Sequence, residues 1–208
     1  MQKPIIKADA ITNLTDARYF AAQYVDYIGF DISKISITTI NAIKEWIAGA
    51  AVVAEVGWLT PLEVIDFVNT SGLNVIQINQ FADARTIRLL IQVTVIQEVI
   101  LEDLQNVAFA DTLFATNQLA VDWFLLDYTR NGFAWDSLSP QHREQLRAWC
   151  EQYPILLNIT HRVEELPDIL SSISPKGVCV SGSEEEKVGF KSFDEMNDWF
   201  DALEEITT

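Results

Sequence analysis

Cysteine and histidine are scarce in this sequence, which has two of each. Cys150 and Cys179 lie far apart, and neither they nor His142 and His161 have the spacing of metal ligands. We therefore expect no metal site and no disulfide framework, with both thiols reduced and packed inside a cytoplasmic protein. His142 is expected on the surface of a helix, and His161 in a loop.

Positive charge is scarce too: 14 Lys and Arg residues stand against 30 Asp and Glu residues, for a net charge of −16. Such a surface repels the phosphates of nucleic acids and anionic lipids, so we expect no nucleic-acid partner and no membrane partner. No apolar run reaches the roughly 18–20 residues that cross a bilayer. The N-terminus also lacks the pattern of a secretory signal peptide.

Linkers are missing as well, since no Pro/Gly/Ser-rich or low-complexity stretch divides the 208 residues. Hydrophobic residues make up 49% of the chain and charged residues 21%, which is the balance of a globular protein. The sequence therefore predicts one domain over residues 1–208.

What the sequence does have is a repeated alternation of apolar runs and helical periodicity. The runs are rich in Val and Ile and apolar on both faces, as buried parallel strands are. They cover residues 4–8, 25–30, 51–56, 74–79, 93–99, 121–127, 154–159 and 176–181. Helix starts between them are marked by Thr60-Pro61-Leu62-Glu63 and Ser139-Pro140. Eight strand–helix units predict an α/β fold, a single-domain (β/α)8 TIM barrel, because an open doubly wound sheet usually stops at about five or six strands.

The end of the first run, Lys7-Ala8-Asp9-Ala10-Ile11-Thr12, takes on meaning in such a barrel. The C-terminal ends of barrel strands form the active face, so a carboxylate there is a catalytic candidate. The alternative is a solvated strand-end carboxylate, with Lys7 as the ion partner of Asp9.

Several short motifs stand in the order and at the spacing of a known family. They are Lys7-Ala8-Asp9-Ala10-Ile11-Thr12, Gly29-Phe30, Gln77-Ile78-Asn79-Gln80, Leu125-Leu126-Asp127 and Gly177-Val178-Cys179-Val180-Ser181-Gly182-Ser183. Through them the chain resembles, over its whole length, phosphoribosylanthranilate isomerase, a (β/α)8 barrel of tryptophan biosynthesis. The family patterns are Lys-x-Cys-Gly-x-Thr, Gly-Phe, Gln-Leu-His-Gly, Leu-Leu-Asp and Gly-Val-Asp-Val-Ser-Ser-Gly, respectively.

The resemblance implies an Amadori rearrangement of an aminoaldose phosphate to an aminoketose phosphate, which needs an acid and a base. It gives Asp127 as the acid and Asp9 as the base, where the family has cysteine. The similar barrel isomerase of histidine biosynthesis uses two aspartates, so the exchange is compatible with this chemistry. The implied substrate-binding residues are Lys7, Thr12, Lys34, Gln77, Asn79, Arg130, Ser181, Gly182 and Ser183. No cofactor is implied.

The chain departs from the family where the phosphate should bind. The glycine-rich loop after Leu-Leu-Asp is replaced by residues 128–136, in which only Gly132 remains and Tyr128 and Trp135 add bulk. Asn158-Ile159-Thr160 replaces Ala-Gly-Gly, and its side chains would block a close backbone approach. Glu184-Glu185-Glu186 would repel a dianionic phosphate. Lys34 replaces an arginine that binds the anthranilate carboxylate.

Two functions therefore stay open. One is an isomerase of this family, with altered activity, acting on a sugar phosphate. The other is a non-catalytic small-ligand-binding or regulatory barrel that has lost phosphate binding. Trp58 and Trp135, expected in loops at the mouth, would suit an aromatic ligand or pack within the loops. In either case we expect a small-molecule partner and a monomer or homodimer.

Overall fold

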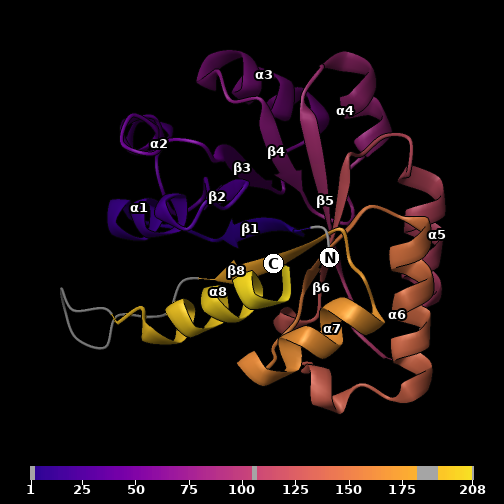
Figure 1. Ribbon diagram of the computed structural model, residues 1–208. Coiled ribbons are helices and arrows are strands. Elements are labelled where there is room, and N and C mark those ends of the chain that lie inside the picture. The colour runs from indigo at the N-terminus through magenta and orange to yellow at the C-terminus, as the bar shows by residue number, and fades with distance from the viewer. Residues whose placement is uncertain (1–2, 105–106, 182–191, 208) are drawn as a thin grey trace.

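Eight parallel strands close into a barrel in sequence order, and the helices lie around its outside (Figure 1). This computed structural model describes residues 3–104, 107–181 and 192–207. The strands are β1 (Ile5–Asp9), β2 (Tyr27–Asp31), β3 (Ala51–Gly57), β4 (Val75–Ile78), β5 (Thr94–Ile100), β6 (Trp123–Asp127), β7 (Ile155–Asn158) and β8 (Gly177–Ser181). The predicted (β/α)8 fold is confirmed. Among the described residues, no helix has the length and apolar character needed to cross a membrane.

An α-helix follows each strand in the chain. The helices are α1 (Leu14–Ala22), α2 (Ile37–Lys44), α3 (Pro61–Ser71), α4 (Ala84–Leu90), α5 (Ala108–Asn117), α6 (Pro140–Gln152), α7 (Leu166–Ser172) and α8 (Asp194–Thr207). Local sequence sets several of their ends: Thr60 and Glu63 form a capping box at α3, and Gly72 ends that helix with a left-handed φ of 68°. Ser139 caps α6 by accepting a hydrogen bond from the His142 amide.

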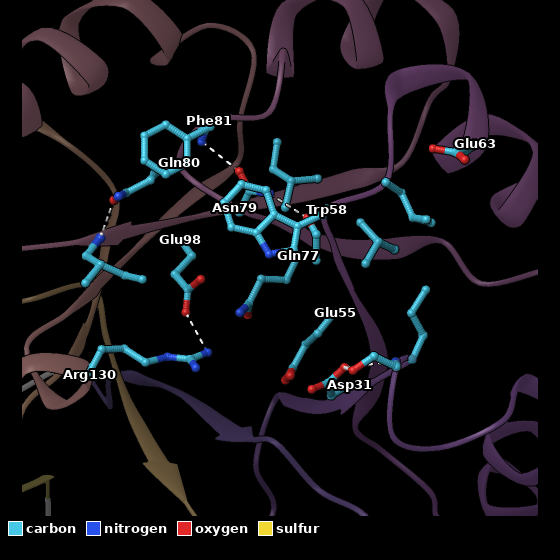
Figure 2. A pocket seen from close by; sticks show the side chains of 17 residues that line it. Asp31, Glu55, Trp58, Glu63, Gln77, Asn79, Gln80, Phe81, Glu98 and Arg130 are labelled. Atoms are coloured by element: carbon cyan, nitrogen blue, oxygen red, sulfur yellow. Dashed lines mark hydrogen bonds and ion pairs between the residues drawn. The ribbon is translucent and has the colours of Figure 1, made fainter.

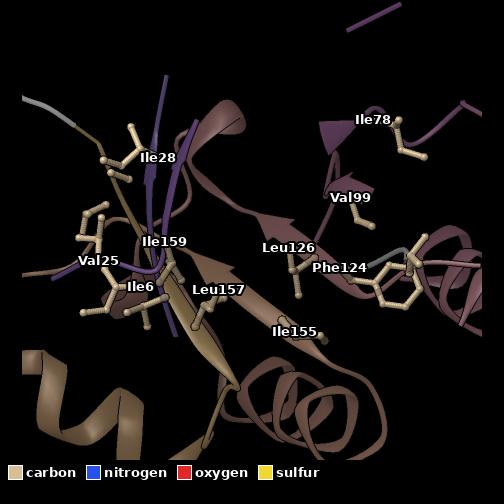
Figure 3. Close-up of a cluster of buried hydrophobic side chains, with 14 of the residues drawn as sticks. Ile6, Val25, Ile28, Ile78, Val99, Phe124, Leu126, Ile155, Leu157 and Ile159 are labelled. Carbon is tan, nitrogen blue, oxygen red and sulfur yellow. The ribbon is translucent and has the colours of Figure 1, made fainter. Parts of the chain in front are cut away.

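Side chains alternate between the inside and the outside of the barrel with a period of two. The outward-facing set packs against the helices and forms the main core, part of which is drawn in Figure 3. The inward-facing set forms a separate apolar level, made of Val53, Val75, Ile96, Leu125, Leu156 and Cys179. Below it, Trp123 Nε1 donates to the Tyr27 hydroxyl at 3.2 Å. Among the described residues these apolar side chains fill the middle of the interior, and the polar side chains lie in the level above them.

Closure of the barrel depends on a glycine where β8 meets β1. Gly177 pairs with Ile5, and a Cβ at position 177 would lie 2.5 Å from the Ile5 carbonyl oxygen and 2.5 Å from Leu156 Cδ2. The carbonyl belongs to the neighbouring strand, so it cannot move aside without shifting the ladder.

We therefore expect Gly177→Ala to lower the free energy of unfolding by about 1–3 kcal/mol, the usual cost of overpacking. Urea denaturation followed by circular dichroism measures this. Ser171→Ala, on the exposed side of α7, serves as the control and should stay within about 0.5 kcal/mol of the parent protein. A Gly177→Ala midpoint equal to that of the control would contradict the proposed crowding at the seam.

Candidate ligand-binding site at the barrel mouth

The upper level of the barrel interior is polar on all eight strands. Its inward-facing residues are Lys7 and Asp9 on β1, Asp31 on β2, Glu55 on β3, Gln77 on β4, Glu98 on β5, Asp127 on β6, Asn158 on β7 and Ser181 on β8. The strand register places them at similar heights, because Asp9 pairs with Ser181, Glu55 with both Asp31 and Gln77, and Asp127 with Asn158. Most of these side chains are buried, so their charges must be matched locally.

Lys7 is the centre of one group in this level. Its ammonium is fully buried, forms an ion pair with Asp9 and lies 3.4 Å from Glu55 Oε1. The same Glu55 oxygen accepts the Ala10 amide at 3.1 Å, and Ala10 has a left-handed φ of 53°. A Cβ on Gly29 would lie 2.1 Å from Glu55 Oε1 and 2.8 Å from Lys7 Nζ. Glycine at position 29 therefore makes room for the buried ion group.

This arrangement pushes the pKa values of its carboxyl groups apart. Burial opposes the charged form of Asp9, but the Lys7 ammonium, the hydrogen bonds from Glu55 and Lys7, and the charge of Arg130 together lower the Asp9 pKa. Burial, followed by the negative charge of Asp9, raises the pKa of Glu55 to about 8. Burial also opposes the charge on Lys7, but Asp9 and Glu55 together raise its pKa. At neutral pH the group therefore holds one ammonium, one carboxylate and one protonated carboxyl.

Asp127, the predicted acid, holds the turn that follows its own strand. Its Oδ1 accepts the Thr129 amide at 2.7 Å, the Thr129 hydroxyl at 2.7 Å and the Arg130 amide at 3.2 Å. Its Oδ2 accepts Asn158 Nδ2 at 3.1 Å. These donors surround a buried carboxylate on both oxygens, which is the pattern of a structural acceptor in a short 3₁₀ turn, η1 (Thr129–Asn131).

Arg130 projects from the same turn toward β5. Its Nη2 donates to Glu98 Oε1 at 3.2 Å, and its Nε lies 3.8 Å from Asp127 Oδ2. Burial raises the pKa of Glu98, and the positive charge of Arg130 opposes that rise only in part. Arg130 is therefore neutralised by the protein's own carboxylates.

Backbone amides of the loop after β6 bond within the protein. Those of Tyr128, Gly132, Phe133 and Trp135 donate to the carbonyls of Asn158, Thr129, Tyr128 and Thr160, at 2.8–3.0 Å. An isolated parallel bridge also joins Ala134 to Thr160, which ties the loops after β6 and β7 together. These amides are not presented to a ligand as a phosphate cradle would be.

The bulky residues of this loop point into the protein. The buried Tyr128 hydroxyl lies 2.8 Å from His142 Nε2, and the His142 ring also contacts the Leu104 carbonyl. The expectation that His142 lies on a helix surface is wrong, because it is 5% exposed. Trp135 is buried, and the Arg143 guanidinium carbon lies over its ring, 4.0 Å from the ring centroid. Trp135 therefore does not line the mouth.

A pocket of about 660 Å³ lies over the strand ends β2–β5. Its lining includes Glu55, Gln77, Glu98 and Arg130, and Figure 2 shows the Gln77 side chain pointing into the space between Glu55 and Glu98. The rings of Trp58 and Phe81 stack at the rim, with centroids 5.8 Å apart and an interplanar angle of 13°. Trp58 is 78% exposed and Phe81 is 63% exposed.

Gln77 has an unused hydrogen-bonding atom in this pocket. It is 5% exposed, and its buried Oε1 has no hydrogen-bond partner among the described residues. Asn79 differs, because its Nδ2 donates to the Gly57 carbonyl at 2.6 Å and its Oδ1 accepts the Phe81 amide at 2.7 Å. Asn79 therefore holds the turn, whereas Gln77 is available to a ligand.

The other predicted site residues are spread over the mouth. Asp9 and Asp127 are not among the described residues that line the pocket. Lys34 is exposed and pairs with Asp31 at 3.2 Å. Thr12 is exposed in the loop between β1 and α1, and Ser181 is exposed at the end of β8. Gly182, Ser183 and the acidic residues 184–186 lie outside the described residues.

Two acidic residues of the pocket were missed from the sequence, Glu55 and Glu98. Glu55 is the only charged residue of β3, and Glu98 is the only charged residue of β5. The sequence signal for both residues is a single charge near the C-terminal end of a buried strand. Such a charge must either form an ion pair or face the active end of the barrel.

These features define a single-domain (β/α)8 barrel with a polar mouth and a small-molecule-sized pocket. Neither a family model nor a curated protein matches the sequence. Solved structures do match. Phosphoribosylanthranilate isomerase from Thermotoga maritima aligns with a TM-score of 0.76 at 18% identity, over 97% of this chain and 99% of that one. The phosphoribosylanthranilate isomerase from Thermus thermophilus aligns with a TM-score of 0.73 at 21% identity, over the same shares of both chains.

A barrel of a different name is also similar: KGPDC from Streptococcus mutans has a TM-score of 0.70 at 11% identity and covers both chains fully. One of the matching isomerase structures is a complex with reduced 1-(o-carboxyphenylamino)-1-deoxyribulose 5-phosphate, and another is of monomers generated from a dimeric isomerase. At these identities the matches establish the fold, and they confirm the resemblance in fold that the motifs predict.

The raised pKa of Glu55 should make stability depend on pH. An unfolded glutamate ionises near pH 4.5, whereas folded Glu55 ionises near pH 8. Its contribution to stability is therefore fully present below the lower value and lost as the pH rises through the upper one. We expect the parent protein to lose at least about 2 kcal/mol relative to Glu55→Gln between pH 5 and pH 8.5.

Urea denaturation of both proteins across this range measures the difference. Asp9 and Lys7 do not interfere, because the lowered pKa of Asp9 and the raised pKa of Lys7 both fall outside the range. Parallel stability profiles for the two proteins would contradict the burial of a protonated Glu55.

Proposed function

We propose that this protein is a small-ligand-binding barrel with the fold of phosphoribosylanthranilate isomerase, and that it does not catalyse the reaction of that enzyme. The carrying observation is the engagement of both Asp127 oxygens: Oδ1 accepts hydrogen bonds that hold the η1 turn, and Oδ2 accepts one from Asn158 on β7. A general acid must present a proton to the substrate. Asp127 would have to give up its turn to do so, and it does not line the pocket.

The other half of the implied reaction is weakened as well. The buried ammonium of Lys7 pairs with Asp9 and lowers its pKa, which makes Asp9 a weak base. A thiolate at this position, as in the family, would be a stronger base.

Loss of phosphate binding fits the same proposal. The amides after β6 bond within the protein, and Arg130 is already matched by Glu98 and Asp127. The pocket is lined by Asp31, Glu55, Glu63 and Glu98 with Arg130 as the one basic residue among those described. Remote binding energy from a phosphate normally positions the reacting sugar, so its loss would cost rate as well as affinity.

A second candidate function is proton transfer on an unphosphorylated substrate. It is favoured by the split between Asp9, whose pKa is lowered, and Glu55, whose pKa is raised to about 8. Two neighbouring carboxyl groups with separated pKa values are a common acid–base arrangement. Hydrogen–deuterium exchange at the carbon beside the carbonyl of simple ketoses, followed by NMR, would detect such an activity, and Asp9→Asn should abolish it.

The proposal predicts no turnover of phosphoribosylanthranilate. The purified protein at high concentration should leave the rate of loss of substrate fluorescence at its buffer value, because neither the acid nor the phosphate site is available. The Thermotoga maritima isomerase, assayed in parallel, is the positive control. Turnover that disappears in Asp127→Asn would overturn the proposal and restore the family reaction.

Phosphate binding is a separate test of the same proposal. Inorganic phosphate or ribose 5-phosphate, titrated to roughly 10 mM against the 15N-labelled protein, should cause no saturable amide shifts at this weak-binding limit. Saturable shifts in the loops after β6 and β7 would show that a phosphate site survives.

A further inference from the structure

The pocket over β2–β5 contains an arc of unused hydrogen-bond acceptors. The arc consists of Gln77 on β4 and Glu98 on β5, and Glu55, whose Oε1 already accepts the Ala10 amide, lies beside them on β3. Gln77 contributes its unpartnered Oε1, and Glu98 gives only one of its oxygens to Arg130. Figure 2 shows the three side chains converging on one region of the pocket. A buried acceptor without a donor is costly, so the arc is complete only when a donor enters.

The remaining acidic residues of the pocket are already used by the protein. Asp31 accepts the Ser33 amide and hydroxyl and pairs with Lys34. Glu63 closes the capping box of α3. The demand for a donor is therefore concentrated at the acceptor arc and is not spread over the whole acidic rim.

The rim beside the arc is aromatic. Trp58 and Phe81 present stacked rings that are largely exposed, and both line the same pocket. Exposed aromatic rings attract cations through their faces and also pack against apolar groups. A ligand that suits both parts carries a cationic donor and a carbon skeleton. A bare metal ion would leave the aromatic rim unused.

We propose that this pocket binds an organic amine in its ammonium form, donating hydrogen bonds to Gln77 and Glu98. The carbon part of the amine lies against Trp58 and Phe81. This deepens, and rests on, the proposed function as a small-ligand-binding barrel. The charge preference is opposite to that of an anionic sugar phosphate.

Proton release is a further consequence. A cation near Glu55 favours its charged form, so binding near neutral pH should displace the proton that this carboxyl holds. The charged and titratable groups around Glu55 are Lys7 and Asp9 on β1, Asp31 on β2, Cys179 on β8, and Glu98 on β5 with its partner Arg130. These groups surround Glu55 with and without a ligand. Proton release on binding therefore comes from the positive charge that the amine adds.

Three probes with the same ring separate charge from shape: phenethylamine, 2-phenylethanol and 3-phenylpropionate. Isothermal titration at pH 7 and low salt should give a dissociation constant for the amine of roughly 1 mM or tighter. The alcohol and the carboxylate should bind at least tenfold more weakly. Titration of the amine in two buffers of different ionisation enthalpy should show proton release, which Glu55→Gln should remove.

Variants then locate the ammonium. Glu98→Gln and Gln77→Leu should each weaken binding of the amine by roughly tenfold or more, since each removes an acceptor of a charged donor. Glu45→Gln, an exposed change at the end of α2, makes the same change in net charge away from the pocket and should leave affinity within about twofold.

The inference is overturned if the amine fails to bind at roughly 10 mM, or if the alcohol or the carboxylate binds as tightly. It is also overturned if Glu98→Gln and Gln77→Leu bind the amine as the parent does. Tight binding of the alcohol or carboxylate would leave the small-ligand barrel standing and remove only the charge preference. Turnover of phosphoribosylanthranilate would remove the proposed function itself, so the two failures are distinguishable.

Discussion

The buried ammonium of Lys7 is the constraint on which the mouth of this barrel depends. A charge fully removed from water is tolerated only when it is paired and hydrogen-bonded. Asp9 supplies the counter-charge, and Glu55 Oε1 lies near the ammonium. Gly29 leaves the space, and Ala10 adopts a left-handed φ that brings its amide onto Glu55. One lysine thus joins three neighbouring strand ends and lowers the pKa of Asp9, while burial and the negative charge of Asp9 raise the pKa of Glu55.

The same constraint changes the meaning of the strand-end motif. Read as a pattern, Lys7-Ala8-Asp9 puts a carboxylate where a related barrel has its base. In the folded protein that carboxylate is the counter-ion of Lys7, and the neighbouring carboxyl of Glu55 holds the proton. The carboxyl that holds the proton is therefore the one on β3, which lines the pocket over β2–β5. Aspartate in place of cysteine at position 9 is compatible with base chemistry by itself. Its ion pair with the buried Lys7 is what makes Asp9 a weak base.

The fold could be predicted from the sequence because its signals are local. Strands apolar on both faces and helices with marked caps need no knowledge of distant contacts. The site could be predicted only in part, because its decisive contacts join residues far apart in the chain. Lys7 and Glu55 meet across three strands, and Tyr128 turns inward to His142 instead of filling the mouth. The direction of a loop side chain depends on the residues that surround it in the folded protein. The hydrophobic periodicity of the sequence does not identify those residues.

Hydrogen-bond accounting decides what kind of molecule the mouth can accept. An anion needs unspent donors, and here the amides of the loop after β6 and the guanidinium of Arg130 are already engaged by the protein. Among the described residues that line the pocket, the unspent group is an acceptor, the buried Oε1 of Gln77. Because a buried polar atom without a partner costs about 1–3 kcal/mol, a pocket of this composition gains most from a ligand that brings donors. The fold shared with the phosphoribosylanthranilate isomerases is thus compatible with a ligand of the opposite charge, because the strands set the shape and a few side chains at their ends set the charge preference.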